Sequence, residues 1–189
     1  MVLHGDDMDN ASTTTHLTLG TNGVDLILQP NAAALTSGFV NYYSPGATWT
    51  SRTSGGNHFT GVTYGNGIFV AVGSAGTILT SPDGSAWTQR TSGITNAFYG
   101  ITYGDGTFVA VGEGGKILTS SDGSTWTPRT SGQNSTLTNV TYANGKFVTV
   151  GNSGTILTSP YGTAWTTRTS ETTNAFSGIT YGDGTFVAV

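Results

Sequence analysis

The chain repeats itself with a period of 39 residues over most of its length. The stretch ITYGDGTFVAV occurs at 101–111 and again, unchanged, at 179–189. Two sets of aromatic residues recur at spacings of 38 or 39, namely Tyr64, Tyr103, Tyr142 and Tyr181, and Trp49, Trp87, Trp126 and Trp165. A period of about 40 residues is typical of one β-propeller blade, a small sheet that buries its faces only against its neighbours. The repeat therefore predicts stacked copies of one unit.

Each repeat is predicted to form four antiparallel strands. In the cleanest copy, Asp105-Gly106 favours a type I′ hairpin turn, and the run 107–111 is apolar on both faces, which is typical of a strand covered on both sides. A turn at 112–115 leads to a third strand, and a fourth contains Pro128. Because proline is tolerated only on an edge strand, we expect the fourth strand to be outermost. The fold class is therefore all-β, a β-propeller of four-stranded blades.

The repeats cover 47–189, and residues 1–46 form a separate β-rich segment. Within that segment, 17–34 contains two alternating apolar stretches joined by Thr-Asn-Gly, which predicts a short hairpin. The last repeat supplies only two strands in this chain, so one sheet edge needs a cover. Three sources remain open: residues 38–53 of the same chain, another subunit of a homo-oligomer, or a continuation of the natural chain.

Composition excludes several classes of function. Only 8% of residues are charged, the net charge is −4 and the six basic residues are scattered, which is unlike a nucleic-acid binder. The chain has no cysteine, so disulfides and thiolate metal sites are excluded. The first ten residues are typical of neither a signal peptide nor a membrane anchor. We expect no membrane insertion, and a location in a virion or on an extracellular surface.

Two motifs resemble known families. The stretches ILTSPDGSAW (78–87) and ILTSSDGSTW (117–126) resemble the Asp-box, or bacterial neuraminidase repeat, of sialidase-type and photosystem II stability factor propellers. This resemblance implies a propeller but no particular activity. Tyr161 replaces the aspartate in the third copy, so we expect Asp83 and Asp122 to cap local backbone amides and to do no chemistry. Residues 17–34 resemble a phrase in bacteriophage tail-fibre and appendage proteins, which implies attachment to other virion subunits through residues 1–46.

The pattern offers no catalytic or metal site. Arginine recurs once per repeat, at Arg52, Arg90, Arg129 and Arg168, and this regularity indicates an outer-edge charge, since a substrate clamp needs convergence on one point. The three histidines lack metal-ligand spacing, and no carboxylate pair suits glycoside hydrolysis. We therefore expect no catalytic residue, no metal and no cofactor. The repeat tyrosines are expected to pack in the core.

The segments that join successive repeats vary more than the strands, so one rim is the expected place for ligand binding. The candidate residues are Asn57, His58, Asn96, Tyr99, Asn134 and Asn174. The sequence predicts a non-enzymatic structural or binding protein, a phage tail-fibre or appendage component that displays these loops to a surface glycan or protein. The alternatives are a sialidase-like glycoside hydrolase and a structural connector without a ligand.

Overall fold

The structure is a computed structural model that describes residues 16–19, 24–27 and 58–189. The chain divides into two compact units, Met1–Thr50 and Ser51–Val189. In the first unit, β1 (His16–Leu19) pairs antiparallel with β2 (Val24–Ile27), and Leu19 lies opposite Val24. This confirms the short hairpin predicted there. The segment 38–53 and the residues Trp49 and Asn57 lie outside the described residues.

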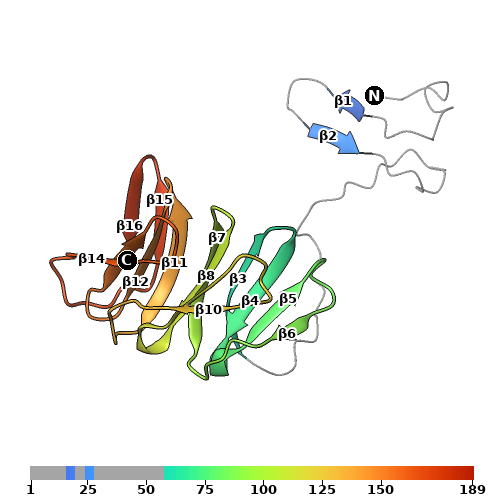
Figure 1. Ribbon diagram of the computed structural model, residues 1–189. Helices are drawn as coiled ribbons and strands as arrows, with labels where there is room; N and C mark the ends of the chain where they lie inside the picture. Colours follow the sequence, from blue (N-terminus) through green and yellow to red (C-terminus); the bar gives the residue numbers. More distant parts are fainter. Residues whose placement is uncertain (1–15, 20–23, 28–57) are drawn as a thin grey trace, which may run out of the picture. The chain divides into compact units, whose positions relative to one another are not determined.

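The second unit consists, over its described part, of antiparallel sheets that follow one another along the chain (Figure 1). The first contains β3 (Phe59–Gly65), β4 (Ile68–Gly73), β5 (Ile78–Ser81) and β6 (Thr88–Arg90), and the second contains β7 (Phe98–Gly104), β8 (Thr107–Gly112), β9 (Ile117–Ser120) and β10 (Thr127–Arg129). The third contains β11 (Leu137–Ala143), β12 (Lys146–Gly151), β13 (Ile156–Ser159) and β14 (Thr166–Arg168), and a two-stranded fourth contains β15 (Ile179–Gly182) and β16 (Thr185–Ala188). The all-β prediction of four-stranded blades is thus confirmed.

The turns have the backbone geometry that their sequences predict. Asp105 has φ 46° and Gly106 has φ 73°, the two positive values of a type I′ turn. The same pair of positive angles occurs at Asn66-Gly67, Asn144-Gly145 and Asp183-Gly184. Short 3-10 turns, η2 (Ser74–Gly76) and η3 (Glu113–Gly115), join the second strand to the third in the first two sheets.

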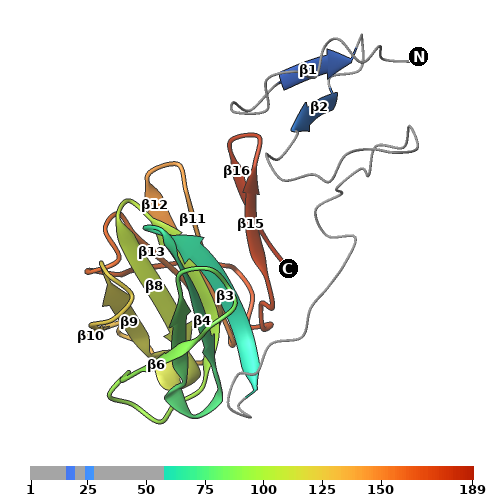
Figure 2. The ribbon, with the colours of Figure 1, turned by 90° about the vertical axis from the view of Figure 1, so that its right-hand side faces the viewer.

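The sheets stack through their first strands. β3 lies beside β7, β7 beside β11 and β11 beside β15, and Figure 2 shows β15 and β16 at one end of the series. The outer edges are β6, β10 and β14. Pro128 lies on β10 opposite Leu118, as expected for an edge strand. Sheets joined side by side through their inner strands are the arrangement of propeller blades.

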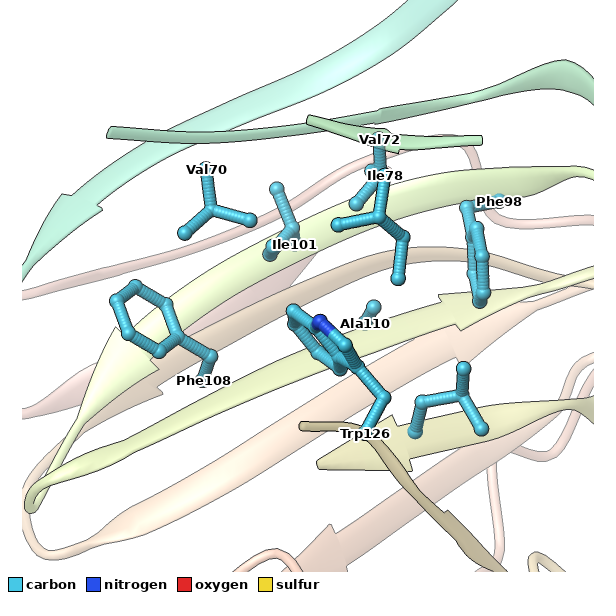
Figure 3. Packing of buried hydrophobic residues seen from close by; sticks show 9 residues of the cluster. Val70, Val72, Ile78, Phe98, Ile101, Phe108, Ala110 and Trp126 are labelled. Carbon is cyan, nitrogen blue, oxygen red and sulfur yellow. The ribbon is translucent and has the colours of Figure 1, made fainter. Parts of the chain in front are cut away.

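The core lies between successive sheets (Figure 3). A first cluster combines Val70, Val72 and Ile78 of the first sheet with Phe98, Ile101, Phe108, Ala110, Leu118 and Trp126 of the second. A second cluster combines Val109, Val111 and Ile117 with Leu137, Val140, Phe147 and Leu157. The run Phe108–Val111 of β8 is fully buried because its side chains alternate between these two clusters. Burying each large apolar side chain stabilises the fold by roughly 1.5–3 kcal/mol.

Candidate functional site

Tyr103 and Tyr142 pack within and between sheets, whereas Tyr64 is 57% exposed, so the predicted core packing of the repeat tyrosines holds only in part. Each ring lies 4.6–4.7 Å, centroid to centroid, from the phenylalanine opposite it in the same hairpin, as in the pair Tyr103 and Phe108. The ring of Tyr103 also lies directly against Gly65 of the preceding sheet, where a Cβ atom would overlap it. Tyr142 covers Gly104 in the same way. These contacts give the tyrosines a packing role along the inner strands.

The repeat tryptophans close the turn between the third and fourth strands. The indole N–H of Trp126 donates a hydrogen bond of 3.0 Å to the carbonyl of Gly123, and the side chain is buried in the first cluster. Trp87 and Trp165 donate to Gly84 and Gly162 in the same way. The described tryptophans therefore hold the outer strands against the sheets.

Aspartate in the same turn caps the backbone. Oδ1 of Asp122 accepts hydrogen bonds from the backbone amides of Ser124 at 2.8 Å and Thr125 at 2.9 Å, and from the hydroxyl of Ser120 at 2.9 Å. The oxygen of that hydroxyl accepts in turn from the amide of Gly123 at 2.8 Å. The first sheet repeats this arrangement around Asp83. Both carboxylates are directed into their own turns.

These hydrogen bonds also change the acidity of the two carboxyl groups. The amides of Ser85 and Ala86 hold the pKa of Asp83 below its ordinary value of 3.8, because they stabilise the charged form. The amides of Thr125 and Ser124 lower the pKa of Asp122 for the same reason. An acid for proton transfer needs the opposite shift, so the two groups are suited to capping.

The loops that link one sheet to the next share a rigid anchor. The hydroxyl of Ser131 donates to the carbonyl of Gln133 at 3.2 Å and accepts from the amide of Gln133 at 3.1 Å. That carbonyl lies against Gly115, which has φ 70° and no room for a Cβ atom. The equivalent residues are Ser92, Ile94 and Gly76 in the first sheet, and Ser170, Thr172 and Gly154 in the third. The backbone is therefore fixed while the side chains that follow the serine differ.

These loops lie at one end of the sheets, here called the loop end, which comprises residues 91–97, 130–136 and 169–175 with the turns after β4, β8 and β12. An open depression of about 760 Å³ at this end is lined by residues 75–77, 89–96 and Lys116. Arg90 donates through Nε to Oγ1 of Thr80 at 2.8 Å, which fixes its guanidinium beside the depression. Lys116 reaches the same depression from the second sheet, so two cations line it.

Glu113, in the 3-10 turn just before Lys116, is bound by the backbone. A carboxylate oxygen of Glu113 accepts a hydrogen bond from the amide of Ala97 at 3.3 Å. Among the residues that line the depression itself, none is acidic. In a chain with a net charge of −4, the charged side chains that line this depression are thus the two cations Arg90 and Lys116.

Two solved structures of YCF48 share this fold. The structure of YCF48 bound to D1 peptide has a TM-score of 0.55 and 18% identity, and the match covers 64% of this chain and 42% of that chain. YCF48 from Cyanidioschyzon merolae gives a TM-score of 0.51 and 19% identity, over 59% of this chain and 37% of that chain. The likeness confirms the β-propeller architecture. The chain spans about two fifths of the length of these neighbours.

No protein-family model matches the chain, and a search of curated proteins found no match. The resemblances to Asp-box repeats and to phage appendage proteins therefore gain no support from these comparisons. What is shown is the propeller and its repeated sheets.

The predicted ligand-binding residues that the structure describes lie at the loop end of the sheets, but they do not line a single pocket. Asn96 lines the depression, whereas Tyr99 is 40% exposed near the start of β7 and His58 is exposed just before β3. Asn134 and Asn174 are exposed in the next two loops. A second depression of about 580 Å³ is lined by Arg168–Thr173 and includes Glu171.

Sequence reasoning missed Arg90 and Lys116 as lining residues. Arg90 lies on the outermost strand β6, as its edge-charge interpretation predicts, but it also borders the depression. Lys116 occupies a position where the other repeats have Thr77 and Thr155, so its departure from the repeat was a usable signal. Arg129 and Arg168 each donate through Nε to a threonine of their own sheet, so each is held within its own sheet.

Over the described ranges, no group of three or more His, Asp or Glu side chains is placed to hold a metal ion. The same part of the chain contains no helix long and apolar enough to cross a membrane.

Proposed function

We propose that this protein is a non-enzymatic recognition module whose loop end binds a segment of a protein or peptide. The observation that carries the proposal is the depression that Arg90, Lys116 and Asn96 line, beside loops of fixed backbone and variable side chains. Rigid scaffolds with variable loops are a common means of presenting a binding surface. One solved neighbour, YCF48, has been seen with a bound peptide, which supports this ligand class.

The chemistry of the depression favours an acidic ligand. The terminal nitrogens of Arg90 and the ammonium of Lys116 suit a carboxylate, which accepts charge-assisted hydrogen bonds from both. Asn96 adds an amide that can both donate and accept. Since the depression is open and wide, it suits an extended segment better than a small enclosed molecule.

The absence of catalysis is part of the proposal. Support comes from Asp83 and Asp122, whose carboxylates are bound by backbone amides. It also comes from the arginines of the described residues, Arg90, Arg129 and Arg168, each of which is held in its own sheet. Turnover of a fluorogenic sialoside or another glycoside would favour the alternative of a glycoside hydrolase. A connector without a ligand would bind nothing in the assays below.

The proposed setting is a virion appendage, attached through residues 1–46 and exposed outside the cell. Its support is the resemblance of residues 17–34 to phage appendage proteins. In that setting a surface glycan is a second ligand class, and the exposed Tyr99 ring offers a surface on which a sugar can stack. Detection of the chain in a purified particle by mass spectrometry tests the setting.

The binding proposal is tested by screening the full chain against a library of 12-residue synthetic peptides and a glycan array side by side. We expect acidic peptides to be selected. Lys116→Thr should weaken the binding of the best peptide at least fivefold. Threonine suits the fold at this position, because the equivalent positions 77 and 155 already carry it. The matched control, Lys146→Thr, removes the same charge from the hairpin turn at the other end and should leave binding unchanged. Equal losses in both variants, or no selected peptide, would refute the proposal.

A further inference from the structure

Successive sheets fit together through a bulky residue on one inner strand and a glycine on the preceding one. Tyr103 covers Gly65, and Cγ2 of Ile101 lies 3.3 Å from where a Cβ atom of Gly61 would be. The next interface repeats the fit, with Tyr142 over Gly104. In the inner strands β3 and β7, one face therefore carries the bulky residues, here called the ridge, and the opposite face carries two glycines, here called the glycine notch.

The first sheet has a ridge that nothing in the described chain covers. Val62 and Tyr64 of β3 are 62% and 57% exposed. The equivalent residues one repeat later are less exposed: Ile101 is only 8% exposed, and Tyr103 is partly buried against the first cluster. The ridge of β3 is thus the same apolar surface without the sheet that covers it elsewhere.

The fourth hairpin has the opposite feature, a glycine notch that nothing in the described chain fills. No atom lies within 4 Å of a Cβ position built on Gly182. At Gly178 the nearest such atom is Cγ2 of Val189, at 3.7 Å, which belongs to the same hairpin. The third sheet, in contrast, has Asn139 and Ala143 at these two positions, and β15 packs against β11 over a shorter stretch than β7 packs against β3.

We propose that the ridge of Val62 and Tyr64 docks into the notch of Gly178 and Gly182 on a second copy of the chain. The residues on both sides match the interface between the first and second sheets, where a tyrosine covers one glycine and a β-branched side chain covers the glycine four residues before it. The contact of tyrosine over glycine recurs between the second and third sheets. The ridge and the notch are uncovered at the same time in one chain, so in this structure they do not meet each other.

The proposed interface joins two different surfaces, so the copies associate head to tail. Repetition of such a contact builds a closed ring or an open series, depending on the angle between copies. The ridge and notch lack charged side chains, and so the association should depend little on salt. This proposal concerns inner strands and is independent of the ligand proposed for the loop end.

The first test compares variants of the full 189-residue chain by sedimentation velocity across a concentration series. Replacing Gly182 by alanine leaves the free hairpin unstrained, because the space is open and Ala143 occupies the equivalent place in β11. A docked tyrosine would overlap the new methyl group, as at Gly65. We expect the wild-type chain to self-associate, Gly182→Ala to weaken association at least tenfold with an unchanged melting temperature, and the control Thr185→Ala to behave as wild type. A monomeric wild type, or an unaffected Gly182→Ala, would overturn the proposal.

The second test identifies the contact directly. A photoreactive phenylalanine analogue replaces Tyr64, and isotopically heavy and light copies are mixed before irradiation. Trypsin should release residues 53–90 joined to 169–189, since no lysine or arginine lies inside either segment. Heavy-to-light pairs would establish contact between copies. Pairs formed only within one isotope population would indicate closure of a single chain on itself and overturn the proposal, as would cross-links to other segments.

Discussion

Ser159 and Tyr161 occupy positions where the two preceding sheets have a serine hydrogen-bonded to an aspartate. The hydroxyl of Ser159 is buried and has no hydrogen-bond partner, whereas the hydroxyls of Ser81 and Ser120 donate to Asp83 and Asp122. Tyr161 is 67% exposed and offers the turn no acceptor. The third sheet therefore lacks the aspartate cap that the first two sheets have in the same turn.

Restoring the aspartate should stabilise the protein. Tyr161→Asp gives Ser159 an acceptor and caps two backbone amides, and such a cap contributes about 1 kcal/mol. The gain should appear as a higher urea midpoint of unfolding. Tyr161→Ala is the control, because it removes the ring without adding an acceptor. If both variants unfold at the same urea concentration, the loss of the carboxylate does not explain a weaker third turn.

A glycine of the notch should not tolerate substitution where a tyrosine of the next sheet covers it. Gly65→Ala places a methyl group in the ring of Tyr103, and overpacking of this kind costs about 1–3 kcal/mol. Gly182→Ala, the same change at an open notch, should alter stability by less than about 0.5 kcal/mol. Thermal unfolding of dilute samples measures both. Similar losses in the two variants would contradict the packing described between β3 and β7.

Acid should weaken the capped turns. The folded-state pKa values of Asp83 and Asp122 lie below the ordinary 3.8 because backbone amides stabilise the carboxylates. Their contribution is therefore complete above that value and is lost as the pH falls through the lowered pKa values. Melting temperatures from pH 7 to pH 2 should fall mainly below about pH 4. The double variant Asp83→Asn, Asp122→Asn should show a flatter acid limb, and identical limbs would count against this source of pH dependence.

The loop anchor should control local opening. Ser92 is buried, and its hydroxyl both donates to and accepts from the backbone of Ile94. Ser92→Ala should cost about 1 kcal/mol and speed amide hydrogen exchange in residues 93–97. The matched loops that follow Ser131 and Ser170 should keep their exchange rates. Unchanged protection in residues 93–97 would show that the loop is held by other contacts.

Periodicity was enough to predict the sheets. The tyrosine and tryptophan spacing, the Asp-Gly or Asn-Gly turns and Pro128 together predicted four-stranded antiparallel units with an outer fourth strand, because these features act within one repeat. The substitution of Tyr161 in the third turn was also visible in the sequence. Its consequence for Ser159 needed coordinates, since it depends on burial of one hydroxyl.

Contacts between sheets were harder to predict. Lys116 borders the same depression as Arg90 only because neighbouring sheets stack at a particular angle, and strand patterns carry no information on that angle. The packing of Tyr103 over Gly65 also depends on how neighbouring sheets stack. The sequence does show alanine at position 143 where the first two repeats have glycine, which indicates that the third interface differs. Departures from a repeat were thus more informative about the surface than the repeat itself.

The serine anchor separates the course of each loop from the identity of the residues that it displays. A hydroxyl and a cradling glycine hold the backbone, so the positions beyond the anchored carbonyl can change without disturbing the strands on either side. Randomising residues 95–96, 134–135 and 173–174 together, with Ile94 kept because it packs against the first cluster, would turn the protein into a cysteine-free scaffold for selecting new binders.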